Sequence, residues 1–478
     1  MSKDYSKYFG PSLKDARKRL NKEVENIDFE MTESLKGLGQ NKKYLIKTYG
    51  CQANLSDSEK LAGILELLEF QPTEIEEEAD VIIINTCAIR ENAENRVFGE
   101  IGRIKSLKRH NPDMLLVLCG CMPQEERVVQ LVMEKHPQVD IVFGTHNIHK
   151  FGEYLYDAYF SKEKVVEVFS KEGDIVEKVP IKRAHNKKAW VNIIYGCDEF
   201  CTYCIVPYTR GKERSRLPED IFEEVNELID QGYQEITLLG QNVNAYGNDF
   251  QDRNYRFADL LNDLNKMPIA RVRFTTSHPK DLDDETIAVM AKRGNIMPYL
   301  HLPVQSGSNH VLKRMNRKYT KEEYLNKIAK LRALIPDISL TTDIIVGFPG
   351  ETDEDFEETL DLVRKANFEG AYTFIFSPRS GTPASKYEDT LDPKIKKQRL
   401  LTLNALINEG YLRGNKRFEK ETVQVLVEGA SDKNDKLLTG YTEHNKLVNF
   451  EGSQELIGKI VSVNIEKAFS WHLRGKIV

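Results

Sequence analysis

Residues 196–204 read Gly-Cys-Asp-Glu-Phe-Cys-Thr-Tyr-Cys and directly follow an apolar run, Trp190–Tyr195, that is typical of a buried strand. Three thiolates at this spacing, from Cys197, Cys201 and Cys204, suit one soft metal centre, and cysteine sulfur is the ligand that iron–sulfur clusters use. A structural zinc site needs a fourth ligand, and neither Cys nor His follows Cys204 at zinc-finger spacing. The pattern therefore predicts a four-iron cluster with three protein ligands, in which one iron stays open to another molecule.

The bulk composition limits the class of protein. The 478 residues exceed one ordinary domain and predict roughly two to four. The formal net charge of −6 does not favour wrapping of nucleic acid through bulk charge. Seven cysteines, an odd number, favour metal binding or catalysis over disulfides. The start of the chain is polar, and no apolar run reaches the roughly 18 residues of a membrane helix, so we expect a cytoplasmic protein with no membrane contact. We also expect a monomer.

The first third of the chain alternates strand and helix patterns, which predicts a parallel α/β sheet. Ser56 or Asp57 is expected to cap its first helix. Three cysteines each follow an apolar strand, and the carboxyl ends of parallel strands share one edge of a sheet, where ligands bind. Alone, each is more typical of a small buried hydrophobe, and Cys119, inside its strand, is assigned to the core. The shared position of the other three predicts a second metal site, formed by Cys51, Cys87 and Cys121.

The middle of the chain repeats a strand and a helix six times, which predicts an open, partial (β/α)6 barrel with its site at the carboxyl ends of the strands. Basic residues outnumber acidic ones, eight to three, between Pro180 and Arg216. This favours a phosphate-binding rim, with a solvated loop as the alternative. The predicted strands are Trp190–Tyr195, Glu235–Gly240, Val272–Thr276, Ile296–Leu302, Ile338–Val346 and Tyr372–Phe376. The helices predicted between them are Ile221–Gln231, Phe257–Lys266, Asp284–Arg293, Lys321–Ile335 and Asp353–Ala366.

The cysteine pattern of residues 196–204 resembles the signature of the radical S-adenosylmethionine (SAM) enzymes. The resemblance implies that these cysteines hold a [4Fe-4S] cluster, that the open iron binds SAM, and that cleavage of SAM yields a 5′-deoxyadenosyl radical. It also places the ring of Tyr203 beside the adenine of SAM. Amides and hydroxyls after the barrel strands suit the polar groups of SAM, with ordinary loop capping as the alternative. These residues are Gln241 and Asn242, which stand where many members have Gly-Gly-Glu, and Ser277, Gln305 and Ser306.

The N-terminal third resembles the methylthiotransferase N-terminal domain, which implies that Cys51, Cys87 and Cys121 hold an auxiliary [4Fe-4S] cluster that presents sulfur. The matching stretches are Gly-Cys-Gln-Ala-Asn (50–54), Asn-Thr-Cys-Ala-Ile-Arg (85–90) and Gly-Cys-Met-Pro-Gln (120–124).

Five short strand patterns near the C-terminus resemble the TRAM domain, a small all-β, OB-like barrel that binds RNA. The branch that acts on isopentenyl-adenosine is indicated by Cys-Thr-Tyr-Cys-Ile-Val-Pro-Tyr-Thr-Arg-Gly (201–211), Arg-Phe-Thr-Thr-Ser-His-Pro (273–279) and His-Leu-Pro-Val-Gln-Ser-Gly-Ser (301–308).

The resemblance implies tRNA modification: SAM-dependent radical methylthiolation at C2 of N6-isopentenyladenosine 3′ to the anticodon, position 37. It implies two [4Fe-4S] clusters and SAM as cofactors. The implied partners are the anticodon stem-loop of tRNA, an electron donor such as flavodoxin or ferredoxin, and a sulfur source. Alternative substrates are threonylcarbamoyl-adenosine in tRNA and a ribosomal protein aspartate. A non-catalytic RNA-binding protein with structural clusters is the alternative from a different class.

The patterns and the resemblance together divide the chain into five expected parts. They are a partly disordered N-terminal extension (1–42), a methylthiotransferase N-terminal domain (43–160), a linker (161–188), a radical SAM core (189–415) and a TRAM domain (416–478).

Overall fold

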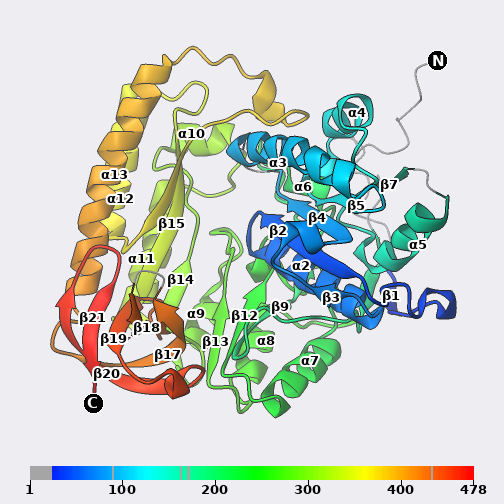
Figure 1. Ribbon diagram of the computed structural model, residues 1–478. Helices are drawn as coiled ribbons and strands as arrows, with labels where there is room; N and C mark the ends of the chain where they lie inside the picture. Colours follow the sequence, from blue (N-terminus) through cyan, green and yellow to red (C-terminus); the bar gives the residue numbers. More distant parts are fainter. Residues whose placement is uncertain (1–23, 89–90, 162–163, 169–172, 432–433) are drawn as a thin grey trace. The chain divides into compact units, whose positions relative to one another are not determined.

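The computed structural model describes residues 24–88, 91–161, 164–168, 173–431 and 434–478 (Figure 1). Most of the expected N-terminal extension lies outside the described residues. Contacts divide the chain into two compact units, and each is built from separate segments. Unit 1 comprises Met1–Ala184, Tyr195–Arg214 and Arg379–Ser385; unit 2 comprises His185–Ile194, Ser215–Pro378 and Lys386–Val478. The three cysteines of residues 196–204 therefore belong to unit 1, together with the three N-terminal cysteines.

Unit 1 contains the predicted parallel sheet, with strands in the order β3-β2-β4-β5-β6-β7. The first five follow the 2-1-3-4-5 order of doubly wound sheets, which bind ligands where the strand order reverses, here between β2 and β4. The strands are β2 (Lys43–Tyr49), β3 (Gln71–Pro72), β4 (Val81–Thr86), β5 (Leu115–Gly120), β6 (Ile141–Phe143) and β7 (Val165–Glu167).

Helices cover both faces of this sheet, as strands buried on both sides require. Leu61, Ile64 and Leu155 pack on one face, whereas Val97 and Val132 pack on the other. The helices are α2 (Gln52–Leu67) and α5 (Phe151–Ser161) on the first face and α3 (Glu91–His110) and α4 (Glu126–Lys135) on the second. The fold class predicted for this part of the chain is confirmed.

The segment expected to be a linker contains strands where the structure describes it. β7 extends the six-stranded sheet, and β8 (Ile175–Glu177) pairs in parallel with β1 (Asn26–Asp28). Each of these strands has only three residues, too few for the alternation of polar and apolar side chains to stand out from the surrounding charges.

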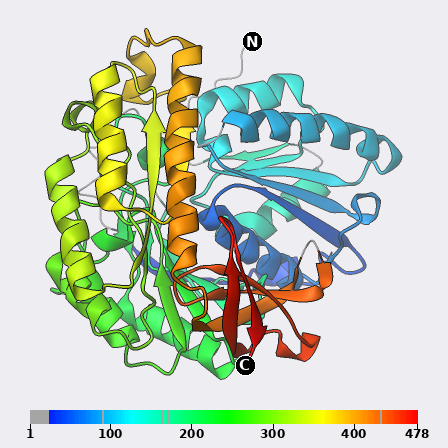
Figure 2. The ribbon, with the colours of Figure 1, turned by 90° about the vertical axis from the view of Figure 1, so that its left-hand side faces the viewer.

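Unit 2 contains the predicted open barrel, built from two three-stranded parallel sheets, β13-β12-β9 and β14-β15-β16. A single parallel bridge between Val272 and Ile296 continues the first sheet toward the second. Figures 1 and 2 show α11, α12 and α13 side by side on the outer face of the second sheet. The strands are β9 (Lys188–Asn192), β12 (Glu235–Leu239), β13 (Arg271–Phe274), β14 (Tyr299–His301), β15 (Ser339–Val346) and β16 (Ala371–Ile375).

The barrel helices begin close to where the sequence patterns place them, because cap residues mark their starts. Thr320 and Thr352 each accept a hydrogen bond from the third residue of the following helix. The helices are α7 (Pro218–Asp230), α8 (Phe257–Leu264), α9 (Asp284–Ala291), α10 (Asn309–Arg314), α11 (Lys321–Leu334), α12 (Asp353–Ala366) and α13 (Pro393–Lys416). Short elements near the unit boundaries are β10 (Ile194–Tyr195), α6 (Val206–Thr209) and β11 (Arg214–Ser215).

The C-terminal strands form a closed barrel in the order β17-β18-β19-β21-β20. Two buried arginines of β13 bind its backbone: Arg271 donates to the carbonyls of Tyr441 and Gln424, at 2.9 and 2.8 Å, and Arg273 donates to those of Thr442 and Glu443. The barrel is therefore fixed to the amino-terminal part of a core strand. Its strands are β17 (Thr422–Ser431), β18 (Asn434–Thr442), β19 (Leu447–Glu451), β20 (Ile460–Ala468) and β21 (Leu473–Ile477).

Candidate active site

The carboxyl ends of β2, β4 and β5 carry the three N-terminal cysteines. Cys51 is the N-cap of α2, Cys87 follows β4, and Cys121 follows β5. A hydrogen bond from the Cys87 thiol lowers the pKa of Cys51. Burial raises this pKa and the charge of Arg210 lowers it further, so the pKa of Cys51 is about 5. Burial raises the pKa of Cys121, and Arg210 opposes that effect. The structure thus brings these three thiols together beside the point where the strand order of the sheet reverses.

Helix α2 begins earlier than expected, at Gln52, so the prediction that Ser56 or Asp57 caps it is wrong. Both of those residues lie buried inside the helix. The Cys51 thiol takes the cap position, and the positive end of the helix favours a thiolate there. The start of α2 is thereby part of the candidate site.

Two buried asparagines connect the loops that carry Cys51 and Cys87. The Nδ2 of Asn54 donates to the Oδ1 of Asn85 and to the carbonyl of Thr86, both at 3.1 Å. The Nδ2 of Asn85 donates back to the Asn54 carbonyl at 2.8 Å. Since both side chains are fully buried, these bonds fix α2 to β4 and hold the two cysteine loops in register. Neither asparagine was singled out from the sequence.

Arg210 is a further site residue, which the sequence placed in a phosphate-binding rim. Its side chain is buried; Nη2 donates to the Oδ2 of Asp57 at 2.6 Å, and Nε donates to the Sγ of Cys121 at 3.3 Å. Burial alone would lower the pKa of Arg210, but Asp57, Cys121 and Cys51 together raise it, so the group stays charged. A fixed cation against a cysteine sulfur favours the thiolate that metal binding requires.

Backbone hydrogen bonds hold the loop of residues 196–204, one within the loop and one to the segment that follows it. Cys197 N–H donates to the carbonyl of Gly211 at 3.1 Å, and Cys204 N–H donates to that of Cys201 at 3.0 Å. Burial raises the pKa of Cys197, and Glu213 adds to the shift. Phe200, between the first two cysteines, has a φ of 45°, which is uncommon for a bulky residue and typical of functional loops.

One apolar cluster borders both sets of cysteines. It consists of Ala88, Cys121, Ile205 and Tyr208, with Phe200 packed against them. Ala88 adjoins Cys87, and Ile205 directly follows Cys204, so the cluster connects residues next to each set. Such a cluster excludes water from the thiols that it covers.

The donor chemistry at both sets fits an iron–sulfur cluster better than a mononuclear ion. Within the described ranges, no three His, Cys, Asp or Glu side chains converge in a geometry that holds one metal ion. A cubane differs, because each cysteine binds a different iron and the sulfurs do not converge on one atom. Both sets supply thiols, and Arg210 supplies the charge that compensates a thiolate at Cys121.

In unit 2, several polar residues predicted to contact SAM lie at the carboxyl ends of the barrel strands. Among the residues that the structure describes, the Oδ1 of Asn242, the Oγ of Ser277 and the Oε1 of Gln305 are buried without a hydrogen-bond partner. Buried polar atoms are nearly always paired in folded proteins, so these atoms fit a polar ligand. The Nδ2 and Oδ1 atoms of Asn244 are also buried without a hydrogen-bond partner, and the sequence did not single out this residue.

The backbone at these strand ends is strained. Thr276 and Gln305 each have a φ of 68°, in the left-handed region that a β-branched residue such as Thr rarely adopts. Strain of this kind costs on the order of 1–3 kcal/mol per residue and concentrates at ligand sites. It supports the placement of a ligand at the carboxyl ends of β13 and β14.

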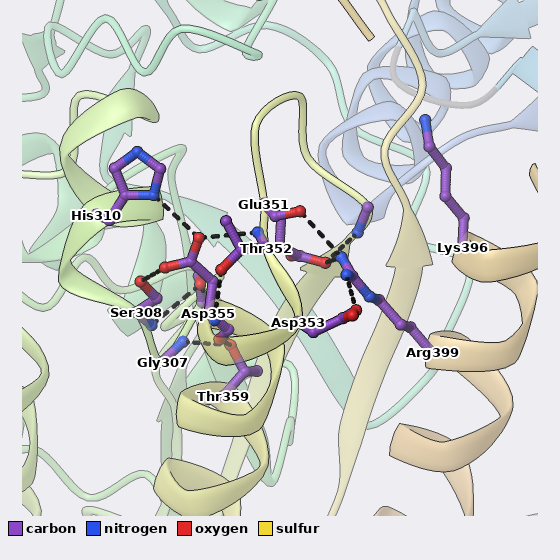
Figure 3. A network of polar contacts seen from close by, with 12 residues as sticks. Gly307, Ser308, His310, Glu351, Thr352, Asp353, Asp355, Thr359, Lys396 and Arg399 are labelled. Carbon is purple, nitrogen blue, oxygen red and sulfur yellow. Dashed lines mark hydrogen bonds and ion pairs between the residues drawn. The ribbon is translucent and has the colours of Figure 1, made fainter. Parts of the chain in front are cut away.

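The loops after β14 and β15 are fixed to helices rather than left free. Ser308 caps α10 and donates to Asp355, and the Gly307 N–H donates to the Oγ1 of Thr359 at 3.0 Å (Figure 3). Arg399 binds Glu351 and Asp353, both at 2.6 Å, and thereby holds the turn after β15 (Figure 3).

For the other three residues expected from the sequence to contact SAM, the contact stays a prediction. The Oγ of Ser306 lies 3.3 Å from that of Thr359 in α12, so it already has a protein partner. Tyr203 is half-buried between Cys201 and Cys204, and Gln241 is half-buried after β12.

Among the described residues, no helix is long and apolar enough to cross a membrane.

Three family models match the chain. The Radical SAM superfamily matches residues 191–363, the Uncharacterized protein family UPF0004 matches residues 43–144, and the TRAM domain matches residues 416–478. Among solved structures, the chain is similar to the radical S-adenosylmethionine methyltransferase TsrM from Kitasatospora setae, with a TM-score of 0.52 and 14% identity over 72% of this chain and 74% of that one. This likeness shows the fold. The family model that spans both the three-cysteine loop and the barrel strands β12 to β15 defines the chain as a radical SAM enzyme.

Two curated relatives match essentially the whole chain. Both are tRNA-2-methylthio-N(6)-dimethylallyladenosine synthases. The one from Bacillus licheniformis is 57% identical over 100% of this chain and 95% of its own length. The one from Bacillus subtilis is 58% identical over the same shares. The chain belongs to the family of the tRNA-2-methylthio-N(6)-dimethylallyladenosine synthases.

Proposed function

We propose that this enzyme methylthiolates C2 of N6-isopentenyladenosine at position 37 of tRNA, giving 2-methylthio-N6-isopentenyladenosine. The observation that carries the proposal is the apolar cluster that borders both sets of cysteines, because it couples two thiol sites in one compact unit. The choice of substrate is supported by the full-length similarity to synthases named for this product. The TRAM domain supports an RNA substrate.

The two sets of thiols would have different tasks. Cys197, Cys201 and Cys204 would hold the cluster that binds and reduces SAM, and Cys51, Cys87 and Cys121 a second cluster that supplies sulfur. Ile205, Tyr208 and Phe200 would keep water from a reactive radical. The orphaned amide and hydroxyl atoms of Asn242, Ser277 and Gln305 would orient the polar groups of SAM. An electron donor such as flavodoxin or ferredoxin and a separate sulfur source complete the proposal, with the enzyme acting as a cytoplasmic monomer.

The test supplies the anaerobically purified enzyme with SAM, a reductant and tRNA that carries N6-isopentenyladenosine. We expect 5′-deoxyadenosine and 2-methylthio-N6-isopentenyladenosine, both detected by mass spectrometry.

In parallel, iron and acid-labile sulfide are measured for the wild type and a Cys197/Cys201/Cys204→Ala variant. About eight irons per chain falling to about four supports two separate clusters. Zinc, or loss of all iron in the variant, contradicts the second cluster, and product from threonylcarbamoyl-adenosine instead contradicts the choice of substrate.

Gly196→Ala is expected to displace the loop of residues 196–204. Gly196 has a φ of 75°, and an added Cβ would lie 1.9 Å from the carbonyl oxygen of Lys212. A shift of about 1 Å at a reacting centre can cost roughly a hundredfold in rate, so we expect SAM cleavage to fall at least that far. Gly37→Ala is the matched control, because Gly37 has a φ of 73° but no atom within 4 Å of an added Cβ. Equal losses in both variants would contradict a role for the close approach.

A further inference from the structure

The second barrel sheet has two faces of opposite character. Thr373 of β16 donates to Asn404 of α13, and Ala371 and Ile375 pack against the barrel core. Because side chains alternate along a strand, Tyr372 and Phe374 point to the other face, away from the helices that Figures 1 and 2 show. Their side chains are 60% and 39% exposed.

Neighbouring strands supply polar groups to this same face. Asp343 pairs with Tyr372 across β15 and β16, and Ile345 pairs with Phe374. The Nε2 of His301 lies 3.3 Å from the Oδ1 of Asp343, and the His301 ring meets the Tyr372 ring edge to face, with 5.9 Å between centroids. We call His301, Tyr372 and Phe374, with the Asp343 and Ile345 side chains beside them, the aromatic face.

The aromatic face begins at the C-terminal barrel and extends toward the carboxyl ends of the strands. Asn445, in the turn between β18 and β19, hydrogen-bonds the hydroxyl of Tyr299, which in turn lies 2.9 Å from the hydroxyl of Thr341 in β15. His444 of the same turn contacts Asp337 at 2.9 Å. The turn between β18 and β19 therefore adjoins the sheet that carries the aromatic face, and an RNA held at this turn would reach that face.

We propose that the aromatic face stacks the target base of the tRNA and directs it toward the strand ends. Exposed aromatic rings on an edge strand favour a binding role, since natural edges are usually covered or charged. An anticodon-loop base can be unstacked and placed on an aromatic ring, and rings bind bases through their flat faces. Ile345 and Phe374 supply apolar surface for an alkyl substituent on the base. The inference rests on the proposed function, because it names where that function's substrate binds.

The test measures binding of the full-length holoenzyme to two fluorescent anticodon stem-loops. One carries N6-isopentenyladenosine at the target position, and the other carries an abasic site there. We expect Tyr372→Ala and Phe374→Ala each to raise the Kd for the first RNA roughly tenfold to a hundredfold, the range that lost stacking gives. The Kd for the abasic RNA should not change. Tyr372→Phe and Phe374→Tyr keep the rings and should restore binding.

Phe160→Ala is the matched control, since Phe160 is 67% exposed on α5 of unit 1. It should leave both Kd values unchanged.

Equal weakening toward both RNAs, or wild-type binding by the alanine variants, would overturn the proposal. A raised KM for SAM without a change in RNA binding would also overturn it, because the rings would then serve the cofactor. If the wild type makes no methylthiolated tRNA, the proposed function fails, whereas unchanged binding with normal product formation defeats only the aromatic face.

Discussion

Cys201→Ala is expected to abolish cleavage of SAM, whereas Cys87→Ala is expected to keep SAM cleavage but to form no methylthiolated tRNA. Cys201 belongs to the loop of residues 196–204, and Cys87 belongs to the cluster of thiols at the ends of β2, β4 and β5. Each thiol is one of only three in its set, so its loss leaves a cluster with two protein ligands. The measurement is 5′-deoxyadenosine and methylthiolated nucleoside from the same reaction mixture, by mass spectrometry.

Cys119→Ala is the matched control for both variants. Cys119 is buried in β5, two residues before Cys121, and packs with the core on the α2 face of the sheet. Burial raises the pKa of its thiol well above the usual range, so it is a poor thiolate ligand. We expect Cys119→Ala to cost some stability and to keep both products. Methylthiolated tRNA from Cys87→Ala would contradict the division of tasks between the two sets.

Arg210→Met is expected to destabilise unit 1 by about 3–5 kcal/mol, because it leaves the buried Asp57 carboxylate without its partner. The pair is short, at 2.6 Å, and both side chains are 8% exposed. The variant should also lose iron at the N-terminal cysteines, since Cys121 loses its hydrogen-bond donor. Urea unfolding, followed by circular dichroism, measures the stability, and metal analysis measures the iron.

Two further variants serve as controls for Arg210→Met. Arg127→Met removes a surface pair with Glu94, whose arginine is 52% exposed, and should cost less than about 1 kcal/mol. The double variant Asp57→Asn/Arg210→Met removes both buried charges and should recover part of the stability that Arg210→Met loses. If Arg210→Met is no less stable than Arg127→Met, the buried pair does not carry the stability assigned to it.

The sequence predicted the elements that repeat a pattern over many residues. The strand expected at 338–346 is β15, Ser339–Val346, and the helix expected at 353–366 is α12 with the same bounds. Both have long apolar periodicity, and Thr352 supplies a recognisable cap. The positions of Cys51 and Cys87 at strand ends were predictable for the same reason, because the strands before them are continuous apolar runs.

The features that sequence reasoning missed depend on tertiary contacts. Asp57 was expected to cap a helix, but it lies inside α2 and pairs with Arg210, 153 positions along the chain. Local patterns carry no signal for such a pair, and a basic residue in a charged segment is ordinarily solvated. Asn54 and Asn85 were part of the matching stretches, yet only the fold shows that they bind each other.

The distance along the chain between Asp57 and Arg210 also affects how the protein is made. Translation proceeds at about 5–20 residues per second, so Arg210 follows Asp57 out of the ribosome by roughly 8–30 s. Cys121, the last of the three N-terminal cysteines, precedes Arg210 by 89 positions, so for roughly 4–18 s the nascent sheet has all three cysteines without the cation that favours thiolates at Cys51 and Cys121. Assembly of the cluster proposed at these cysteines would therefore be favoured only after residue 210 has been synthesised and packed against α2. Delivery of the cofactor before Arg210 has emerged would come too early, whereas delivery during synthesis of the 268 residues that follow Arg210 would not.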